Sequence, residues 1–480
     1  MSRMVHRSNC GVKIIHGLLQ NINPATGDLI LPSIAITTPS ELSTIISKAK
    51  IAQCVWGNLS LSKRVELLRQ SITTGIIPMA SQLSTTITNE MGKVLSESQL
   101  EVQAAIDMRG KWLDMVREAN EDVVLVEHDN NKKADAEDED DARVLEAAAA
   151  AESVVVRDPL GVVAVLSPWN FPASEISYLA IPALVAGNAV IVKPSEHTPL
   201  SGAMYCAALA SALPEGVLQV VQGDGTVGEQ LVSSDDVHMV AMTGSTATGK
   251  RIMKNCATSL KRLVLELGGK DPMIVFADAD LDVAARDAVT NSLANAGQVC
   301  CSIERLYVEK SVQVEFEQKV VEIARIHKVG MPMEEGVTVG PLVSRMQLEH
   351  VKRQVKESME DGATMLYESA IPTAIDTTTT NMDCEIQHGG NFHPITVLGN
   401  LQQSMSIQKV ETFGPIIAIS TFDGSEENAI TLANDTEYGL TACVYTADLE
   451  KASRVARRIR AGQVGINCYS ADEAHLKCPW

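Results

Sequence analysis

At 480 residues, the chain is long enough to bury more than one core, and two or three domains are expected. Its hydrophobic (45%) and charged (21%) fractions are ordinary for a globular protein, and no run of about 18 apolar residues predicts a membrane span. The formal net charge of −20 argues against a nucleic acid or an anionic membrane as the partner.

Residues 1–27 include Arg3, Arg7 and Lys13 and no acidic residue, a weak likeness to an organellar transit peptide. The cysteines are scattered, without a CxxC pair and without a Cys/His set at zinc spacing. This pattern favours free thiols in a reducing compartment and no metal site. The expected location is therefore cytoplasmic, with an organelle as the alternative.

The N-terminal region is predicted to be a helical layer with few strands. Residues 23–31 predict a turn running into a strand, and a helix follows from Pro39 to Ala52 with Ser40 as its expected N-cap. Apolar periodicity predicts three more helices, over residues 61–73, 78–91 and 96–118.

Two short strands, at 123–126 and 153–156, flank a segment in which acidic residues outnumber basic ones. Part of the net negative charge is concentrated in this segment, residues 127–152, which also contains an alanine run. Its composition indicates a solvated, low-complexity insert, and no residue in it suggests a chemistry.

From residue 158 the pattern changes to short apolar runs that alternate with helices. The runs predict strands buried on both faces, at 162–166, 189–192, 218–221 and 238–242. The intervening helices are expected at 174–186, 200–212 and 247–256. This alternation predicts right-handed βαβ units and a doubly wound parallel sheet.

A second alternation begins at residue 273 and predicts a second α/β domain. Its strands are expected at 273–276, 305–308, 416–422, 441–446 and 464–467. Its helices are expected at 281–294, 311–326, 426–433 and 449–461.

Cys300 lies between a predicted helix and strand, shortly after Gly297, which lets the backbone turn. A cysteine presented at such a junction can act as a nucleophile. Alone the signal is weak, because a buried cysteine is more often a small hydrophobic residue.

Polar residues follow the first two strands of the parallel sheet, at the edge where such folds bind ligands. Asn170, between two prolines, carries an amide that can donate to an oxyanion, although a structural turn is the alternative. Lys193 can bond ribose hydroxyls, and Glu196 beside it would repel a 2′-phosphate. The pair therefore favours NAD over NADP.

The turn 243–249 joins a strand to a helix, and its backbone amides can hold a pyrophosphate. Gly225 lies in a second turn that permits a close approach of the backbone. Glu266 ends a further apolar run, where desolvation would raise its pKa toward that of a general base. An ion pair between Glu266 and Lys270 is the structural alternative.

Six motifs together resemble the aldehyde dehydrogenase superfamily over residues 22–480: PWNFP (168–172), KPSE (193–196), GSTATG (244–249), ELGGK (266–270), GQVC (297–300) and ETFGP (411–415). They occur in the family's order and spacing. The resemblance implies an α/β fold with a Rossmann-like parallel-sheet cofactor domain, an α/β catalytic domain and a small, incomplete oligomerisation element.

The implied domain limits follow from the positions of these motifs. Residues 1–118 and 157–266 would form the NAD-binding domain, and 119–156 an oligomerisation hairpin carrying the acidic insert. Residues 267–480 would form the catalytic domain, with its C-terminal end missing, because the family continues beyond a Pro-aromatic pair such as Pro479-Trp480.

The resemblance also implies residue roles. Cys300 would be the nucleophile, Asn170 the oxyanion donor together with the Cys300 N–H, and Glu266 the general base, while Cys301 would be a neighbour without catalytic use. Residues matching the NAD site are Ser167, Trp169, Lys193, Ser195, Glu196, Gly225, Gly244, Ser245, Leu267, Glu411 and Phe413.

The implied reaction is the oxidation of an aldehyde to its carboxylic acid. The Cys300 thiolate adds to the aldehyde, hydride passes to NAD, and Glu266 activates the water that hydrolyses the thioester. A homodimer or homotetramer is expected for a full-length form. The alternatives are an NADP-preferring or acyl-transferring semialdehyde dehydrogenase, or a truncated, inactive member that acts as a binding partner.

One departure from the family concerns the substrate. Where the family usually places apolar or aromatic residues in the aldehyde tunnel, this chain has Glu175, and Tyr178 replaces an arginine that semialdehyde-carboxylate enzymes often use. We hypothesise that Glu175 admits polar or cationic aldehydes such as aminoaldehydes. The alternative is that Glu175 turns to solvent or pairs with a lysine.

Overall fold

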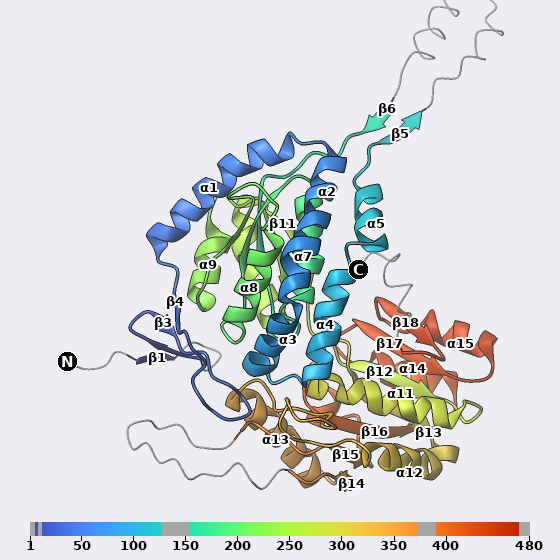
Figure 1. The fold of residues 1–480 in the computed structure, drawn as a ribbon. Helices are drawn as coiled ribbons and strands as arrows, with labels where there is room; N and C mark the ends of the chain where they lie inside the picture. The colour runs from blue at the N-terminus through green and yellow to red at the C-terminus, as the bar shows by residue number, and fades with distance from the viewer. Residues whose placement is uncertain (1–4, 8–11, 127–152, 372–389, 470–480) are drawn as a thin grey trace, which may run out of the picture.

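The computed structural model describes residues 5–7, 12–126, 153–371 and 390–469, which fold into two adjoining lobes (Figure 1). The acidic insert at 127–152 and the C-terminal Pro-aromatic pair lie outside these residues. Among the helices that the structure describes, none combines the length and apolar character required to cross a membrane.

The chain starts with a small antiparallel sheet made of β1 (Val5–Arg7), β2 (Lys13–Ile15), β3 (Leu18–Leu19) and β4 (Ile34–Ala35). The strand predicted within residues 23–31 is wrong. That segment contributes only an isolated bridge between Ile22 and Leu29.

Helix α1 (Pro39–Gly57) begins with a capping box at Thr38, so the prediction of Ser40 as N-cap is wrong. The Thr38 hydroxyl accepts a hydrogen bond from the Glu41 N–H, and the Glu41 carboxylate accepts one from the Thr38 N–H. Proline suits the first helical position because its missing N–H needs no partner there, which puts the cap at the residue before it.

The next helices are α2 (Leu61–Ser71) and α3 (Ile77–Met91), joined by a π-helical segment at Ile72–Ile76. The single helix predicted over 96–118 is instead two helices, α4 (Leu95–Asp107) and α5 (Lys111–Ala119). The break falls at Gly110, with φ −87° and ψ −130°, a non-helical conformation that glycine adopts at low cost.

The first lobe is built on a five-stranded parallel sheet with the order β11-β10-β7-β8-β9. Its strands are β7 (Val162–Leu166), β8 (Ala189–Lys193), β9 (Leu218–Val220), β10 (Met239–Thr243) and β11 (Arg262–Glu266). The associated helices are α7 (Ser174–Val185), α8 (Pro199–Leu209), α9 (Gly225–Ser233) and α10 (Thr246–Cys256). The predicted doubly wound sheet is confirmed, since the apolar strands β7 and β8 are buried on both faces. Helix α9 was not predicted, because its two glycines lower its helix propensity.

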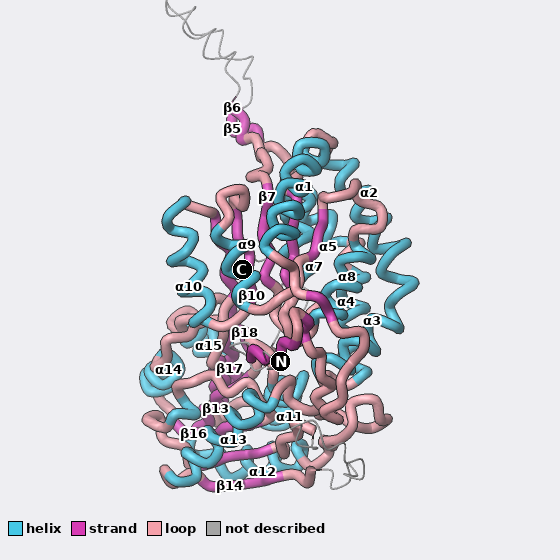
Figure 2. The backbone as a smooth tube through the Cα atoms, turned by 90° about the vertical axis from the view of Figure 1, so that its left-hand side faces the viewer, coloured by secondary structure: helices cyan, strands magenta, loops and turns pink. Residues whose placement is uncertain are grey.

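An antiparallel hairpin of β5 (Val123–Val126) and β6 (Ser153–Val155) projects away from this lobe (Figures 1 and 2). Both strands occur where the sequence predicted them. Val123, Val154 and Val155 are exposed on the hairpin.

The second lobe is built on a seven-stranded sheet with the order β14-β15-β16-β13-β12-β17-β18, in which only β14 and β15 pair antiparallel. Its strands are β12 (Asp271–Val275), β13 (Ile303–Glu309), β14 (Thr364–Glu368), β15 (Thr396–Gly399), β16 (Ile416–Phe422), β17 (Thr441–Tyr445) and β18 (Gln463–Ile466). Its helices are α11 (Leu281–Leu293), α12 (Gln313–Ala324), α13 (Arg345–Glu360), α14 (Glu426–Asn434) and α15 (Leu449–Ala456). The predicted second α/β domain is confirmed, although α13, β14 and β15 were missed.

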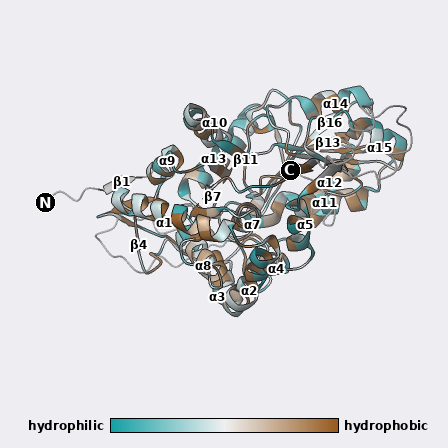
Figure 3. Cartoon of the chain, turned by 90° about the horizontal axis from the view of Figure 1, so that it is seen from above, coloured by the Kyte–Doolittle hydropathy of each residue, from teal (hydrophilic) through white to brown (hydrophobic). Residues whose placement is uncertain are grey.

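Each lobe has its own buried apolar cores. Seen from above, α1, α8 and α9 lie on one side of the molecule and α12, α14 and α15 on the other (Figure 3). The loops at the carboxyl edge of the first sheet meet loops of the second lobe between these cores.

Candidate active site

The site lies at the carboxyl edge of the first sheet, at its switch point. After β7 the chain adds β8 and β9 on one side, and it then crosses over to add β10 and β11 on the other. Open parallel sheets bind ligands where the strand order reverses in this way. The loop after β7 carries Asn170, and Glu266 at the end of β11 lies in register with Thr243 at the end of β10.

The loop that presents Cys300 has an unusual backbone. Asn295, Ala296 and Gly297 have φ values of 51°, 56° and 73°, so three consecutive residues are left-handed. Such a conformation is strained for a residue with a Cβ, and strained backbone persists where surrounding contacts enforce it. The prediction of a turn at Gly297 is confirmed, and a side chain at this position would collide with the Gly414 carbonyl.

Asn170 reaches from the first lobe into this cysteine loop. Its side-chain Nδ2 donates to the Gln298 carbonyl at 3.1 Å, and its own backbone carbonyl accepts from Asn295 Nδ2 at 3.1 Å. The buried Asn170 amide therefore contacts the cysteine loop at Gln298, two residues before Cys300 in the sequence.

The segment after β11 packs against the other side of the cysteine loop. A side chain at Gly269 would collide with the Cys300 carbonyl, so the two backbones are in close contact. The Gly269 N–H donates to the Glu411 carboxylate at 3.1 Å. Residues of ELGGK, GQVC and ETFGP thus meet at one place.

Cys300 and Cys301 form a hydrogen-bonded thiol pair. The pKa of Cys301 is lowered to about 7, because it accepts a hydrogen bond from the Cys300 thiol and receives another from Tyr469. The pKa of Cys300 is raised well above its ordinary value, because its thiol donates to Cys301 and is desolvated.

The Glu175 carboxyl group lies within electrostatic reach of both thiols, and Glu266 lies within reach of Glu175. The pKa of Glu266 is raised by desolvation, as predicted. The Glu175 carboxylate accepts a hydrogen bond from Thr243 Oγ1 at 2.9 Å, and burial, with smaller contributions from Cys301, Glu101 and Glu266, raises its pKa to about 7. Glu175 is partly exposed, and its carboxylate bonds Thr243, so the alternative of a lysine partner is wrong.

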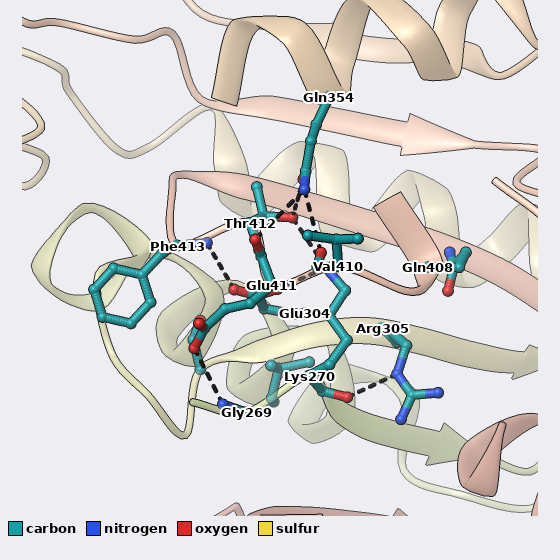
Figure 4. A network of polar contacts seen from close by, with 12 residues as sticks. Gly269, Lys270, Glu304, Arg305, Gln354, Gln408, Val410, Glu411, Thr412 and Phe413 are labelled. Carbon is teal, nitrogen blue, oxygen red and sulfur yellow. Dashed lines mark hydrogen bonds and ion pairs between the residues drawn. The ribbon is translucent and has the colours of Figure 1, made fainter. Parts of the chain in front are cut away.

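The alternative of an ion pair between Glu266 and Lys270 is also wrong. Lys270 Nζ lies 2.6 Å from the Glu304 carboxylate and donates to Thr412 Oγ1 at 2.9 Å. The Glu304 carboxylate in turn accepts from the backbone N–H groups of Thr412 and Phe413, each at 2.8 Å. Figure 4 shows this network beneath the turn that carries Glu411. Burial lowers the pKa of Lys270, and the charge of Glu304 opposes that shift.

A second buried Lys–Glu pair supports the loop after Asn170. Lys93 Nζ lies 2.6 Å from the Glu101 carboxylate, and both side chains are fully buried. The other Glu101 oxygen accepts from the backbone N–H groups of Ala173 at 2.8 Å and Ser174 at 3.2 Å. Lys93 also lies 3.5 Å from the centroid of the Phe171 ring.

The predicted adenosine contacts lie together at the end of β8. Lys193 and Glu196 are buried, with Nζ 3.6 Å from the carboxylate. Lys193 Nζ also donates to the carbonyls of Pro194 and Gly223. The Ser195 hydroxyl accepts from the His197 N–H, so it is used within its own loop.

The other predicted cofactor residues lie around the same edge of the sheet. The Ser245 hydroxyl caps α10 by accepting from the Thr248 N–H, and the Gly244 N–H donates to the Glu266 carbonyl. Gly225 starts α9 with open space beside it. Ser167 is buried after β7, and Leu267 packs on Gly249 of α10.

The two lobes touch through an aromatic contact between Trp169 and Phe413, whose ring centroids are 5.3 Å apart at 86°. Glu411 lies beside Phe413, and its pKa is raised to about 8, chiefly by burial. A dinucleotide bound along this edge would fit the groups present there. They are Lys193 and Glu196 after β8, the N-termini of α9 and α10, and the Glu411 carboxylate beside the aromatic rings.

The sequence missed several residues that support the site, above all Glu101, Glu304, Thr243 and Lys93. Glu304 gave the one usable signal, because a charged Glu304-Arg305 pair lies inside an otherwise apolar strand. No group of three or more His, Cys, Asp or Glu side chains within the described ranges is arranged to hold a metal ion.

Comparison with known proteins gives consistent matches. The profile of the aldehyde dehydrogenase family matches residues 16–480. A protein of Sinorhizobium fredii that is named "Probable succinate-semialdehyde dehydrogenase [NADP(+)]" is 34% identical over 93% of this chain and 84% of its own length. Aminoaldehyde dehydrogenase 1, peroxisomal, of Pisum sativum is 34% identical over 98% of this chain and 88% of its own. The crystal structure of lactaldehyde dehydrogenase from Escherichia coli superposes with a TM-score of 0.82 at 31% identity, covering 94% of this chain and 87% of that one.

Proposed function

We infer that this chain, which belongs to the aldehyde dehydrogenase family, uses Cys300, Asn170 and Glu266 to oxidise an aldehyde to its carboxylic acid. The observation that carries the assignment is the contact between Asn170 and the cysteine loop, at 3.1 Å from Nδ2 to the Gln298 carbonyl. This contact joins the predicted oxyanion donor in one lobe to the loop that carries the predicted nucleophile in the other.

The first step is the addition of Cys300 to the aldehyde carbonyl carbon. The Cys300 proton passes along the hydrogen bond to the Cys301 sulfur in its thiolate form, and a bond forms between the Cys300 sulfur and the carbon. The carbonyl oxygen becomes an alkoxide, which accepts hydrogen bonds from Asn170 Nδ2 and the Cys300 N–H. Cys301, predicted to have no catalytic use, thereby acts as the proton acceptor.

A bound nicotinamide dinucleotide supplies the acceptor for the hydride lost from that carbon. The loss leaves a thioester on Cys300. Glu266, whose pKa is raised by desolvation, takes a proton from water, and the resulting hydroxide attacks the thioester carbon. The carbon–sulfur bond breaks, the acid is released, and the Cys300 thiolate regains its proton from Cys301.

We propose NAD as the preferred cofactor, although one relative above is named for NADP(+). The support is Glu196, whose carboxylate lies 3.6 Å from Lys193 Nζ at the end of β8. Lys193 and Glu196 suit ribose hydroxyls, whereas a 2′-phosphate would bring its negative charge beside the buried Glu196 carboxylate. A higher kcat/KM with NADP than with NAD would contradict this preference.

The reaction is tested by NADH absorbance with a panel of small aldehydes. Cys300→Ala should reduce kcat by at least about 10⁴-fold, and Asn170→Ala by about 10²–10³-fold. Faster turnover with coenzyme A would favour the acyl-transferring alternative. No NADH from the folded chain with any aldehyde would favour a role as a binding partner.

For the substrate we propose cationic aldehydes, because Glu175 is a partly buried carboxyl group within electrostatic reach of Glu266 and Cys301. None of the groups acting most strongly on Glu175 is a cation, so a positively charged substrate would supply its counter-charge. Glu175→Gln should lower kcat/KM for an aminoaldehyde about tenfold more than for an uncharged aldehyde of equal length. Equal effects on both aldehydes would remove this proposal.

We further propose that the protein forms a homo-oligomer through the hairpin of β5 and β6, and that it works in the cytoplasm. The exposed Val123, Val154 and Val155 give the hairpin an apolar surface suited to a second copy. The described cysteines are free, as expected for a reducing compartment. Light scattering of the purified chain tests the proposed homo-oligomer. Fractionation of the host cells tests the proposed cytoplasmic location.

A further inference from the structure

The turn that carries Glu411 and Phe413 is strained. Phe413 has a φ of 54°, a left-handed value that is strained for a residue with a Cβ. Its ring nevertheless has a defined place, edge-on to Trp169 across the lobes. Something in the second lobe must hold this turn in its costly conformation.

Glu304 makes the contacts that hold the turn. Its two carboxylate oxygens accept one backbone N–H each, from Thr412 and Phe413 at 2.8 Å. The oxygen bonded to the Thr412 N–H also receives Lys270 Nζ at 2.6 Å. Around them, Thr412 Oγ1 donates to Gln354 Oε1 at 2.7 Å, and Gln347 Nε2 donates to the Thr412 and Phe413 carbonyls.

We propose that Glu304, paired with Lys270, is a positioning residue that fixes the strained turn 411–413 and thereby orients Glu411 and Phe413 toward the nicotinamide ribose. This inference rests on the proposed function, because it takes Glu411 and Phe413 as the cofactor contacts. Glu304 itself touches neither substrate nor cofactor in this account.

A contribution to stability alone does not explain why Lys270 and Glu304 form a buried ion pair here. A buried ion pair is often no more stabilising than apolar residues of the same volume, because both charges must be desolvated. A carboxylate is nevertheless required here, since its two oxygens accept two consecutive amides and a lysine together. A glutamine offers only one acceptor oxygen, and its NH₂ group would face an amide or the ammonium.

The test compares Glu304→Gln with Glu309→Gln as the matched control. Glu309 ends the same strand, β13, and also accepts a backbone N–H, from Ala277 at 2.8 Å, but it belongs to no part of the site. In the protein without cofactor, hydrogen exchange at the Thr412 and Phe413 amides should become at least about tenfold faster in Glu304→Gln and stay unchanged in Glu309→Gln.

With cofactor, Glu304→Gln should slow the hydride-transfer burst about 10–100-fold, with a larger isotope effect from a deuterated aldehyde. The fluorescence anisotropy of bound NADH should fall, while the dissociation constant for ADP stays within about twofold, because the adenosine contacts are in the other lobe. Glu304→Asp, which keeps the charge but shortens the reach, supplies the same readouts should Glu304→Gln fail to fold.

The proposal is overturned if either folded variant keeps wild-type exchange at these amides and a wild-type burst. It is also overturned if ADP binding weakens in parallel with the burst, which would indicate a general structural role. An inactive wild type whose Glu304 variants still show faster exchange would refute the proposed function and leave the positioning role standing.

Discussion

The two lobes use the same device to hold an active-site loop. In the first, Lys93 and Glu101 hold the amides of Ala173 and Ser174, and in the second, Lys270 and Glu304 hold those of Thr412 and Phe413. Each pair has a nitrogen–oxygen distance of 2.6 Å and is removed from solvent.

The two loops differ in whether their backbone conformation is strained. The amides held by Glu101 lie at the start of α7, where a helix forms readily and its dipole favours a nearby carboxylate. Those held by Glu304 belong to a turn in which Phe413 is left-handed. The same charge pair therefore reinforces a relaxed conformation in one lobe and enforces a strained one in the other.

The largest effect is expected from breaking the first pair. Glu101→Gln leaves Lys93 buried without its counter-charge and should lower the free energy of unfolding by about 3–5 kcal/mol. Urea unfolding measures this change, and the double variant Lys93→Met/Glu101→Gln should recover most of it. Exchange at the Thr412 and Phe413 amides of the folded protein should stay unchanged, because Glu101 touches only the first loop. Faster exchange there would show that the two supports are not independent.

A smaller effect is expected at the thiol pair between the two loops. Alkylation of the wild-type thiols by iodoacetamide should rise as the pH passes about 7, because the pKa of Cys301 is lowered to that value and the thiolate is the reactive form. Cys301→Ser removes the acidic thiol, while burial, Glu175 and Asp271 keep the pKa of Cys300 raised. The inflection should therefore move to higher pH, and an inflection that remains near 7 would contradict this account.

The smallest effect is expected from Thr412→Val. The substitution removes the hydroxyl that bridges Lys270 and Gln354 and leaves both amide contacts of Glu304 intact. Unfolding free energy should fall by about 1 kcal/mol, the net value of a hydrogen bond. The hydride-transfer burst should remain close to that of the wild type, and a loss as large as that of Glu304→Gln would assign the positioning role to the hydroxyl instead.

The sequence predicted the parts of the fold and site whose signals are local. Apolar runs marked the buried strands, and Gly297 marked the turn before Cys300. Glu101 and Glu304 were missed because the amides that they bind are distant in the sequence. Those bound by Glu101 begin 72 positions away and those bound by Glu304 begin 108 positions away, and no periodicity or spacing reveals such contacts. Lys270 was given Glu266 as its possible partner because the two are close in sequence, whereas pairing across β12 and β13 brings Glu304 to it.

The aromatic contact between the lobes includes a fluorescent side chain, that of Trp169. Trp169 is one of four tryptophans in the chain and lies against both Phe413 and His197. A change in how closely the loops on the two sides are packed is therefore expected to alter the contribution of Trp169 to the indole emission of the protein.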